Sequence, residues 1–94
     1  MTNKTTQLNV LIVDDEVNIR KTLSYCLVAE GHAVVSVSNA SDAVDEARRC
    51  AFDLAFVDLK LGADNGMALI PALLSESPWT KVVVITAYAS IESA

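Results

Sequence analysis

Acidic residues directly follow two short apolar runs in this sequence. Asp14 and Asp15 come after the run at residues 8–13, and Asp58 closes the run at residues 53–57. If both runs are parallel strands, these acids lie at the carboxyl ends of the strands, which is the edge of an open α/β sheet where ligands bind. Carboxylates gathered there repel one another unless a cation offsets their charge, and hard oxygen ligands select Mg²⁺ or Mn²⁺. The pattern therefore predicts a divalent metal site.

Asp58 and a residue at the end of a later run could also act on a phosphoryl group. Carboxylates serve as nucleophiles toward phosphorus in enzymes that pass through an aspartyl phosphate, and Asp58, which ends its own run, is the candidate nucleophile. Thr86 closes a further apolar run at residues 81–86. Its hydroxyl would lie at the same edge of the sheet, where it could donate a hydrogen bond to a new phosphoryl group.

The elements that must position these residues alternate along the chain. Short β-branched or apolar runs predict strands at 8–13, 33–37, 53–58 and 81–86, and apolar residues at helical spacing predict helices that start near residues 17, 40 and 67. This β-α-β alternation requires a parallel sheet with right-handed crossovers and helices on both faces. We expect a flavodoxin-like, doubly wound α/β fold with strand order 2-1-3-4, in which Asp14, Asp15 and Asp58 meet at the switch point.

Local details of the helices and loops are also predicted. The first helix should bury an apolar face, and the second a narrow stripe of small residues; the faces comprise Val17, Ile19, Leu23, Cys26 and Leu27, then Ala40, Ala43, Val44 and Ala47. Residues 59–66 should form a loop, because glycine, Asp and Asn are frequent there. A third helix at 67–75 accommodates Pro71 only if this proline lies in the first turn.

Composition and charge limit the possible functions. The chain has 94 residues, enough for one domain, of which 52% are hydrophobic and 20% charged, so it can form a core. A formal charge of −5 disfavours contact with nucleic acid or an anionic membrane. Residues 1–7 lack the apolar centre of a signal peptide, and no apolar run has the length that a bilayer crossing needs, so we expect a cytoplasmic protein. Cys26 and Cys50 are expected to be reduced core thiols.

Four short motifs, in this order, resemble the receiver domain of two-component response regulators. They are Leu11-Ile12-Val13-Asp14-Asp15-Glu16, the segment Asp53-Leu54-Ala55-Phe56-Val57-Asp58-Leu59, Gly66, and Val84-Ile85-Thr86-Ala87. The resemblance extends from about residue 8 to the end of the chain. The segment 86–94 is further similar to receivers of NtrC-type transcription activators, which implies regulation of transcription through a downstream effector domain.

The resemblance implies a phosphoacceptor regulatory domain rather than an enzyme. Asp58 would accept a phosphoryl group from a sensor histidine kinase, and Asp15, Asp58 and the backbone carbonyl of Lys60 would hold Mg²⁺, with Asp14 assisting through water. Thr86 would be the switch hydroxyl. The backbone N–H of Ala87 would contact the phosphoryl group.

One departure from the family pattern concerns the C-terminal part. Receivers have a fifth strand that ends in a lysine, and a fifth helix, and this chain ends before them; we therefore expect a polar tail at 1–7 and an incomplete receiver at 8–94. The strand at 81–86 then becomes an open edge that is apolar at consecutive positions. Such an edge predicts a homodimer through residues 82–85, or marginal stability.

Simpler interpretations remain open. Asp14, Asp15 and Glu16 could only cap a helix, and Asp58, Gly66 and Thr86 could be ordinary turn or strand-end residues. Two other functions compete with signalling: a non-switching interaction module with a receiver fold, and a phosphohydrolase that uses an aspartyl phosphate. A phosphohydrolase would want a second acid two positions after the nucleophile, where this chain has Lys60.

Overall fold

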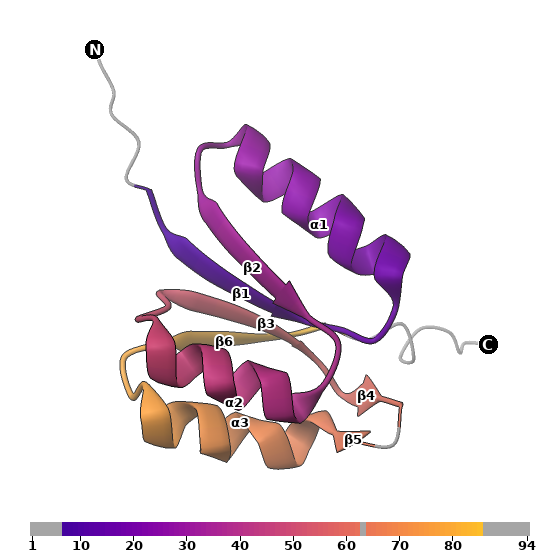
Figure 1. Cartoon of the computed structure of the whole chain (residues 1–94), viewed down its shortest axis with the longest axis vertical. Helices are drawn as coiled ribbons and strands as arrows, with labels where there is room; N and C mark the ends of the chain where they lie inside the picture. The colour runs from indigo at the N-terminus through magenta and orange to yellow at the C-terminus, as the bar shows by residue number, and fades with distance from the viewer. Residues whose placement is uncertain (1–6, 63, 86–94) are drawn as a thin grey trace, which may run out of the picture.

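The structure is a computed structural model that describes residues 7–62 and 64–85. Its main body is a four-stranded parallel sheet with helices on both faces (Figure 1). Within the described residues, none of the helices combines the length and the apolar character that a bilayer crossing would require.

The sheet has the strand order β2-β1-β3-β6, which confirms the predicted order 2-1-3-4 of the four long strands. All three neighbouring pairs are parallel. The strands are β1 (Asn9–Val13), β2 (Ala33–Val37), β3 (Leu54–Asp58) and β6 (Lys81–Ile85). Because β1 and β3 are the central pair, the residues after Val13 and at Asp58 share one edge of the sheet. At that edge the strand order reverses between β1 and β3, which makes it the topological switch point of the sheet.

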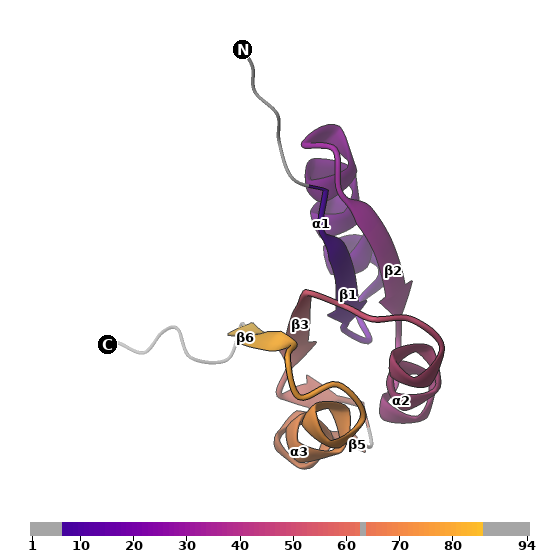
Figure 2. The same ribbon diagram turned by 90° about the vertical axis from the view of Figure 1, so that its left-hand side faces the viewer.

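The helices divide between the two faces. Helix α1 (Val17–Ala29) lies on one face, and α2 (Ala40–Arg49) and α3 (Gly66–Glu76) lie side by side on the other, as the two views in Figures 1 and 2 show. The side chain of Asn39 caps α2 by accepting a hydrogen bond from Asp42 N–H at 2.8 Å. The cover of helices on both faces that alternating β and α elements predict is thus present.

The hydrophobic core lies between the sheet and the pair α2 and α3. Alternate residues of β1 and β3 on this side pack against small residues of α2 and leucines of α3; they include Leu11, Val13, Ala55, Val57, Ala43, Ala47, Leu69 and Leu73. The predicted stripe on α2 is confirmed, since Ala43 and Ala47 are buried and Ala40 and Val44 are half-buried. Small side chains allow this helix to approach the sheet closely.

Helix α1 is covered less than predicted. Leu23 and Leu27 are half-buried, but α1 contains no buried residue. Val17 and Ile19 are 47% and 39% exposed, so their assignment to a buried face was wrong. Among the described residues, α1 packs mainly against β2 and β1, and several of its apolar side chains, including Val17, Ile19 and Val28, are exposed.

The two cysteines were also predicted incorrectly in one respect. Cys26 and Cys50 are free thiols, as expected, but both are exposed rather than in the core. Cys26 lies on the loosely covered helix α1, and Cys50 is the C-cap residue of α2, where the chain leaves the sheet-facing side.

The region around α3 differs from the prediction in two ways. Residues 59–66 are not only a loop, because the two-residue strands β4 (Lys60–Leu61) and β5 (Asp64–Asn65) pair antiparallel within it. Helix α3 begins at Gly66, since Asn65 accepts a hydrogen bond from Met67 N–H at 2.9 Å. Pro71 is therefore the sixth helical residue rather than a first-turn residue, and the Met67 carbonyl loses its partner four residues on. Burial of Leu69 and Leu73 holds the helix together in spite of this loss.

Candidate functional site: an acidic cluster at the switch point

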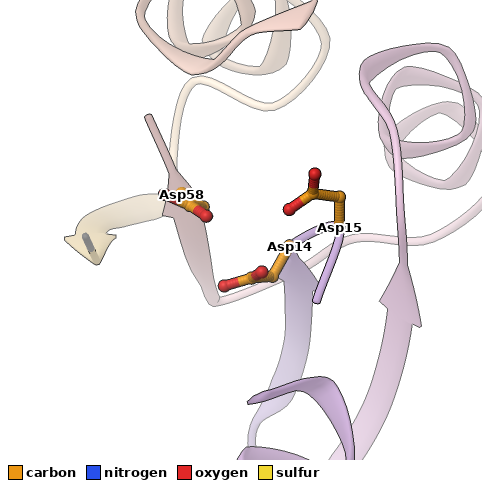
Figure 3. A group of neighbouring side chains, drawn as sticks. All are labelled: Asp14, Asp15 and Asp58. Atoms are coloured by element: carbon orange, nitrogen blue, oxygen red, sulfur yellow. The ribbon is translucent and has the colours of Figure 1, made fainter. Parts of the chain in front are cut away.

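Three carboxylates meet at the carboxyl edge of the central strands. Asp14 and Asp15 directly follow β1, and Asp58 is the last residue of β3. One carboxylate oxygen from each of them lies within 4.8 Å of the other two. Figure 3 shows the three side chains pointing into the same space between the ends of β1 and β3. The predicted convergence of these acids, which are 44 or fewer residues apart in sequence, is confirmed.

The backbone after β1 holds Asp14 in place. Asp14 is 4% exposed, its N–H donates to the Val37 carbonyl at 3.1 Å, and its Oδ1 accepts from Glu16 N–H at 2.8 Å. Arg20 Nη1 donates to the Asp14 carbonyl oxygen at 2.7 Å. The alternative that these acids cap the following helix is not what the structure shows: Glu16 is the N-cap residue of α1, and its side chain makes no capping hydrogen bond.

The electrostatics of Asp14 reflect its buried position. Burial raises the pKa of the Asp14 carboxyl above its ordinary value, and the nearby charges of Asp58, Asp15 and Glu16 raise it further. The hydrogen bond from Glu16 N–H acts in the opposite direction. The protein therefore holds a carboxylate that is costly to ionise in the absence of a cation.

The segment after β3 fixes the other side of the site. Lys60 N–H donates to Asp58 Oδ1 at 3.1 Å, and Gly66 N–H donates to the Leu59 carbonyl at 3.0 Å. A Cβ atom on Gly66 would collide with the Asp58 carbonyl oxygen and with the backbone of Leu59, so only glycine permits this approach. The β4–β5 turn passes through Gly62, whose φ of +60° is in the left-handed region that favours glycine.

The three acids lie at the end of an open cleft of about 1050 Å³ between α1, the sheet and the β4 segment. The cleft is polar at the acids and apolar toward α1 and the end of β6; its walls are Asp14, Asp15, Glu16, Asn18, Ile19, Thr22, Leu23, Asp58, Lys60, Gly62 and Ile85. A small phosphorylated group could reach the carboxylates from solvent through this opening.

The chemistry of the donors fits a hard divalent cation. Carboxylate oxygens within one ligand shell of each other suit Mg²⁺, which keeps some of its waters and binds through few carboxylates. Asp15 is exposed and Asp58 half-buried, so both can exchange water for other ligands. Asp14 is the buried carboxylate of the three, and this position is consistent with a contribution of its negative charge to cation binding.

Not every predicted site residue can be placed. Thr86 and Ala87 lie outside the described residues. Lys60 lies in β4 beside the cluster, where its N–H contacts Asp58, while the role predicted for its carbonyl stays a prediction. Sequence reasoning missed Arg20, which anchors the backbone of Asp14, and the cleft wall on α1 at Ile19 and Leu23. The spacing of Ile19 and Leu23, one helical turn apart just after the acids, was the available signal.

Comparison with known proteins identifies the same kind of domain. The family model that describes the response regulator receiver domain matches residues 10–94. The alginate biosynthesis transcriptional regulatory protein AlgB of Pseudomonas putida is 41% identical over 88 residues, which are 94% of this chain and 20% of that protein. The chain thus spans about one fifth of the length of this curated relative. AlgB is a transcriptional regulator of the NtrC type, in agreement with the resemblance seen in segment 86–94.

Solved structures agree with the sequence comparisons. A response regulator protein from Burkholderia pseudomallei, crystallised with a phosphorylated aspartic acid, a calcium ion and citrate, is 36% identical with a TM-score of 0.85, and the match covers 90% of this chain and 50% of that one. The response regulator protein TrrA from Thermotoga maritima, in complex with Mg²⁺ and BeF, is 26% identical with a TM-score of 0.80, covering 88% of this chain and 72% of that one.

Proposed function

Because this chain belongs to the response regulator receiver domain family, a family of phosphoacceptor regulatory domains rather than classical enzymes, we propose that Asp58 is its phosphoacceptor residue. The observation that carries the proposal is the acidic cluster, in which Asp58 ends a strand beside two further acids. Asp58 is the half-buried carboxylate of the three, and the backbone N–H of Lys60 orients its Oδ1.

The same cluster supports a Mg²⁺ site made by Asp15, Asp58 and the backbone carbonyl of Lys60, with Asp14 acting through water. When bound, the ion would offset carboxylate charge and the charge on the phosphoryl oxygens. The buried carboxyl of Asp14, with its raised pKa, gains most from a nearby cation, since ionisation of this group is otherwise opposed by burial and by its acidic neighbours.

The proposed chemical step uses these groups as follows. A carboxylate oxygen of Asp58 attacks phosphorus, the P–N bond of the kinase phosphohistidine breaks, and the departing imidazole nitrogen recovers its electron pair and takes up a proton. The Lys60 N–H holds the attacking carboxylate of Asp58 in one orientation, which lowers the entropic cost of the reaction. The resemblance supports Thr86 as the switch hydroxyl and Ala87 as a backbone donor to the phosphoryl group.

The partners and setting are part of the proposal. The family implies a sensor histidine kinase as phosphodonor, and the relation to AlgB supports a transcriptional output through effector domains outside this chain. We place the receiver at residues 8–94 after a polar tail at 1–7, and we propose a cytoplasmic location, where such kinases present their phosphohistidine. With a formal charge of −5, this domain is not expected to contact nucleic acid or anionic membranes itself.

A phosphorylation assay tests the proposal. The chain is incubated with Mg²⁺ and acetyl phosphate, and intact-mass spectrometry should show the addition of one phosphoryl group that hydroxylamine removes, as expected of an acyl phosphate. Asp58→Asn should abolish the addition. Asp45→Asn is the matched control, because it removes the same charge from an exposed position on α2 and should leave labelling unchanged.

The competing functions predict different results. A folded chain that acquires no label from acetyl phosphate or from a histidine kinase would be a non-switching interaction module, and the phosphoacceptor role of Asp58 would be wrong. Steady turnover of a small phosphate ester, lost in Asp58→Asn, would indicate a phosphohydrolase instead.

A further inference from the structure

Arg20 connects the first turn of α1 to the backbone that precedes Asp15. Its Nη1 donates a hydrogen bond to the Asp14 carbonyl oxygen at 2.7 Å, and its backbone N–H donates to the Glu16 carbonyl at 3.1 Å. Arg20 is half-buried, and its guanidinium group stays protonated at every pH at which the protein is folded. The side chain therefore makes a short, charge-assisted hydrogen bond to a backbone oxygen.

The Asp14 carbonyl takes a side-chain donor because β2 ends beside it. In a parallel strand the N–H and C=O of one residue point to the same side, and Asp14 N–H bonds to the carbonyl of Val37, the last residue of β2. The Asp14 carbonyl therefore faces the point where the chain leaves β2 and turns into α2 at Asn39. Arg20 supplies from α1 the donor that a longer β2 would have supplied. This side of β1 is the one away from β3 and β6.

The hydrogen bond from Arg20 fixes the peptide group that joins Asp14 to Asp15. A peptide group is planar, so a donor that holds its oxygen also sets the plane of the Asp15 N–H. The other polar groups of Asp14 are anchored separately, because its N–H donates to the Val37 carbonyl and its Oδ1 accepts from Glu16 N–H at 2.8 Å. Loss of Arg20 would free this peptide plane to rotate through coupled changes of ψ at Asp14 and φ at Asp15.

The direction of the Asp15 carboxylate depends on this peptide group. Asp15 is exposed, so its side chain is not held by packing in the core. Figure 3 shows its carboxylate pointing toward Asp58 from the segment just after β1. Rotation of the preceding peptide would carry the Asp15 carboxylate away from Asp14 and Asp58, although the three now have oxygens within 4.8 Å of one another.

We propose that Arg20 is a positioning residue of the cation site, which holds the Asp15 carboxylate in the direction of the ion through the Asp14 carbonyl. This inference deepens the proposed function and rests on it, since the site in question is the Mg²⁺ site that includes Asp15 and Asp58. In this role Arg20 contacts neither the ion nor the phosphoryl group. Removal of residues that orient metal ligands typically lowers metal affinity by about 10- to 100-fold.

The role of Arg20 should appear as a change in Mg²⁺ affinity rather than in the maximal rate of phosphorylation. Asp58, the proposed nucleophile, is oriented by the backbone N–H of Lys60, which does not depend on Arg20. Once Mg²⁺ saturates the site, the nucleophile has the same orientation with or without Arg20. If Arg20 only stabilised the fold, its loss would leave the Mg²⁺ dependence of the folded protein unchanged.

Mg²⁺ titrations of labelling by acetyl phosphate test this distinction in the full chain, at a temperature where circular dichroism shows each variant to be folded. Arg20→Met removes the donor, and should raise the half-saturating Mg²⁺ concentration about tenfold or more while the maximal rate stays within about threefold. Arg20→Lys can still donate one hydrogen bond to the carbonyl, and should recover most of the affinity. Lys21→Met is the matched control, because it removes the same charge from the next, exposed position and should match the parent.

NMR spectra of the metal-free chain test the contact without any ion or phosphodonor. A carbonyl that loses its hydrogen bond shifts its ¹³C resonance upfield, and the ¹⁵N resonance of the following amide shifts with it. In Arg20→Met the Asp14 carbonyl and the Asp15 amide should therefore shift, while the resonances of Asp58 stay at their parent positions. In Lys21→Met all of these resonances should stay unchanged.

The outcomes separate this inference from the proposed function. If the parent chain is labelled on Asp58 and Arg20→Met keeps the parent's Mg²⁺ dependence, with or without a shift of the carbonyl resonance, the positioning role of Arg20 is wrong and the phosphoacceptor role of Asp58 stands. A lower maximal rate at an unchanged half-saturating Mg²⁺ concentration would likewise overturn the positioning role. A parent chain that neither binds Mg²⁺ nor becomes labelled would overturn both.

Discussion

At the scale of single residues, the buried position of Asp14 opposes ionisation of its carboxyl group. Its pKa is raised by burial first and by Asp58, Asp15 and Glu16 next, so the folded protein binds this proton more tightly than the unfolded chain does. The stabilisation that protonated Asp14 gives is complete below the ordinary carboxyl pKa and is lost as the pH rises through the raised pKa. At neutral pH, without metal, the ionised group destabilises the fold.

Asp14→Asn should therefore raise the free energy of unfolding of the metal-free protein at neutral pH. The amide oxygen can still accept the hydrogen bond from Glu16 N–H, so the turn is retained. Below the ordinary carboxyl pKa the difference should vanish. Urea unfolding in the presence of a chelator, at neutral pH and at a pH below the ordinary carboxyl pKa, measures this difference in stability. If Asp14→Asn lowered the stability at neutral pH, the argument that ionised Asp14 destabilises the fold would be wrong.

Gly66 is the second residue whose identity the site requires. Gly66→Ala would force Cβ into the Asp58 carbonyl and the Leu59 backbone, and should cost about 1–3 kcal/mol through overpacking while displacing Asp58. Met67→Ala, at an exposed position in the same turn, should change stability by less than about 0.5 kcal/mol. Chemical denaturation of both variants tests this, and a neutral Gly66→Ala would refute the close approach.

At the scale of elements, the second helix depends on its cap. Asn39→Ala removes the acceptor for Asp42 N–H and should cost about 1 kcal/mol. Ser41→Ala, an exposed change in the same turn, is the control and should be close to neutral. Chemical denaturation measures the effect of both substitutions as a shift of the midpoint, provided that the slope of the unfolding free energy against denaturant concentration is unchanged. Equal effects of the two changes would mean that Asn39 does not set the start of α2.

At the scale of the whole molecule, the charge of −5 and the clustered acids predict that stability depends on divalent cations. If Mg²⁺ binds the folded cluster only, as proposed above, a concentration one hundred times the Kd should add about 2.7 kcal/mol to the free energy of unfolding. Asp15→Asn should remove most of this gain. Asp45→Asn, which removes the same charge from exposed α2, should retain it, and thermal unfolding with and without Mg²⁺ distinguishes them.

The sequence by itself determined the sheet. Four short apolar runs, separated by helical periodicity and closed by acids, are enough to specify strand order and the edge at which Asp14, Asp15 and Asp58 meet, because parallel strands with right-handed crossovers leave few topologies. Only the tertiary structure decided how well each element is covered. Val17 and Ile19 look like core residues along the chain, yet are exposed, because burial depends on which neighbours actually pack against a helix.

Close contacts with the backbone at the site were likewise decided by the tertiary structure. The hydrogen bond from Arg20 to the Asp14 carbonyl and the approach of Gly66 to Asp58 involve backbone atoms, whose positions no side-chain pattern encodes. Pro71 sits inside α3 because the burial of Leu69 and Leu73 outweighs the hydrogen bond that proline removes. Sequence patterns report local preference and periodicity, whereas these outcomes depend on the sum of contacts made once the chain is folded.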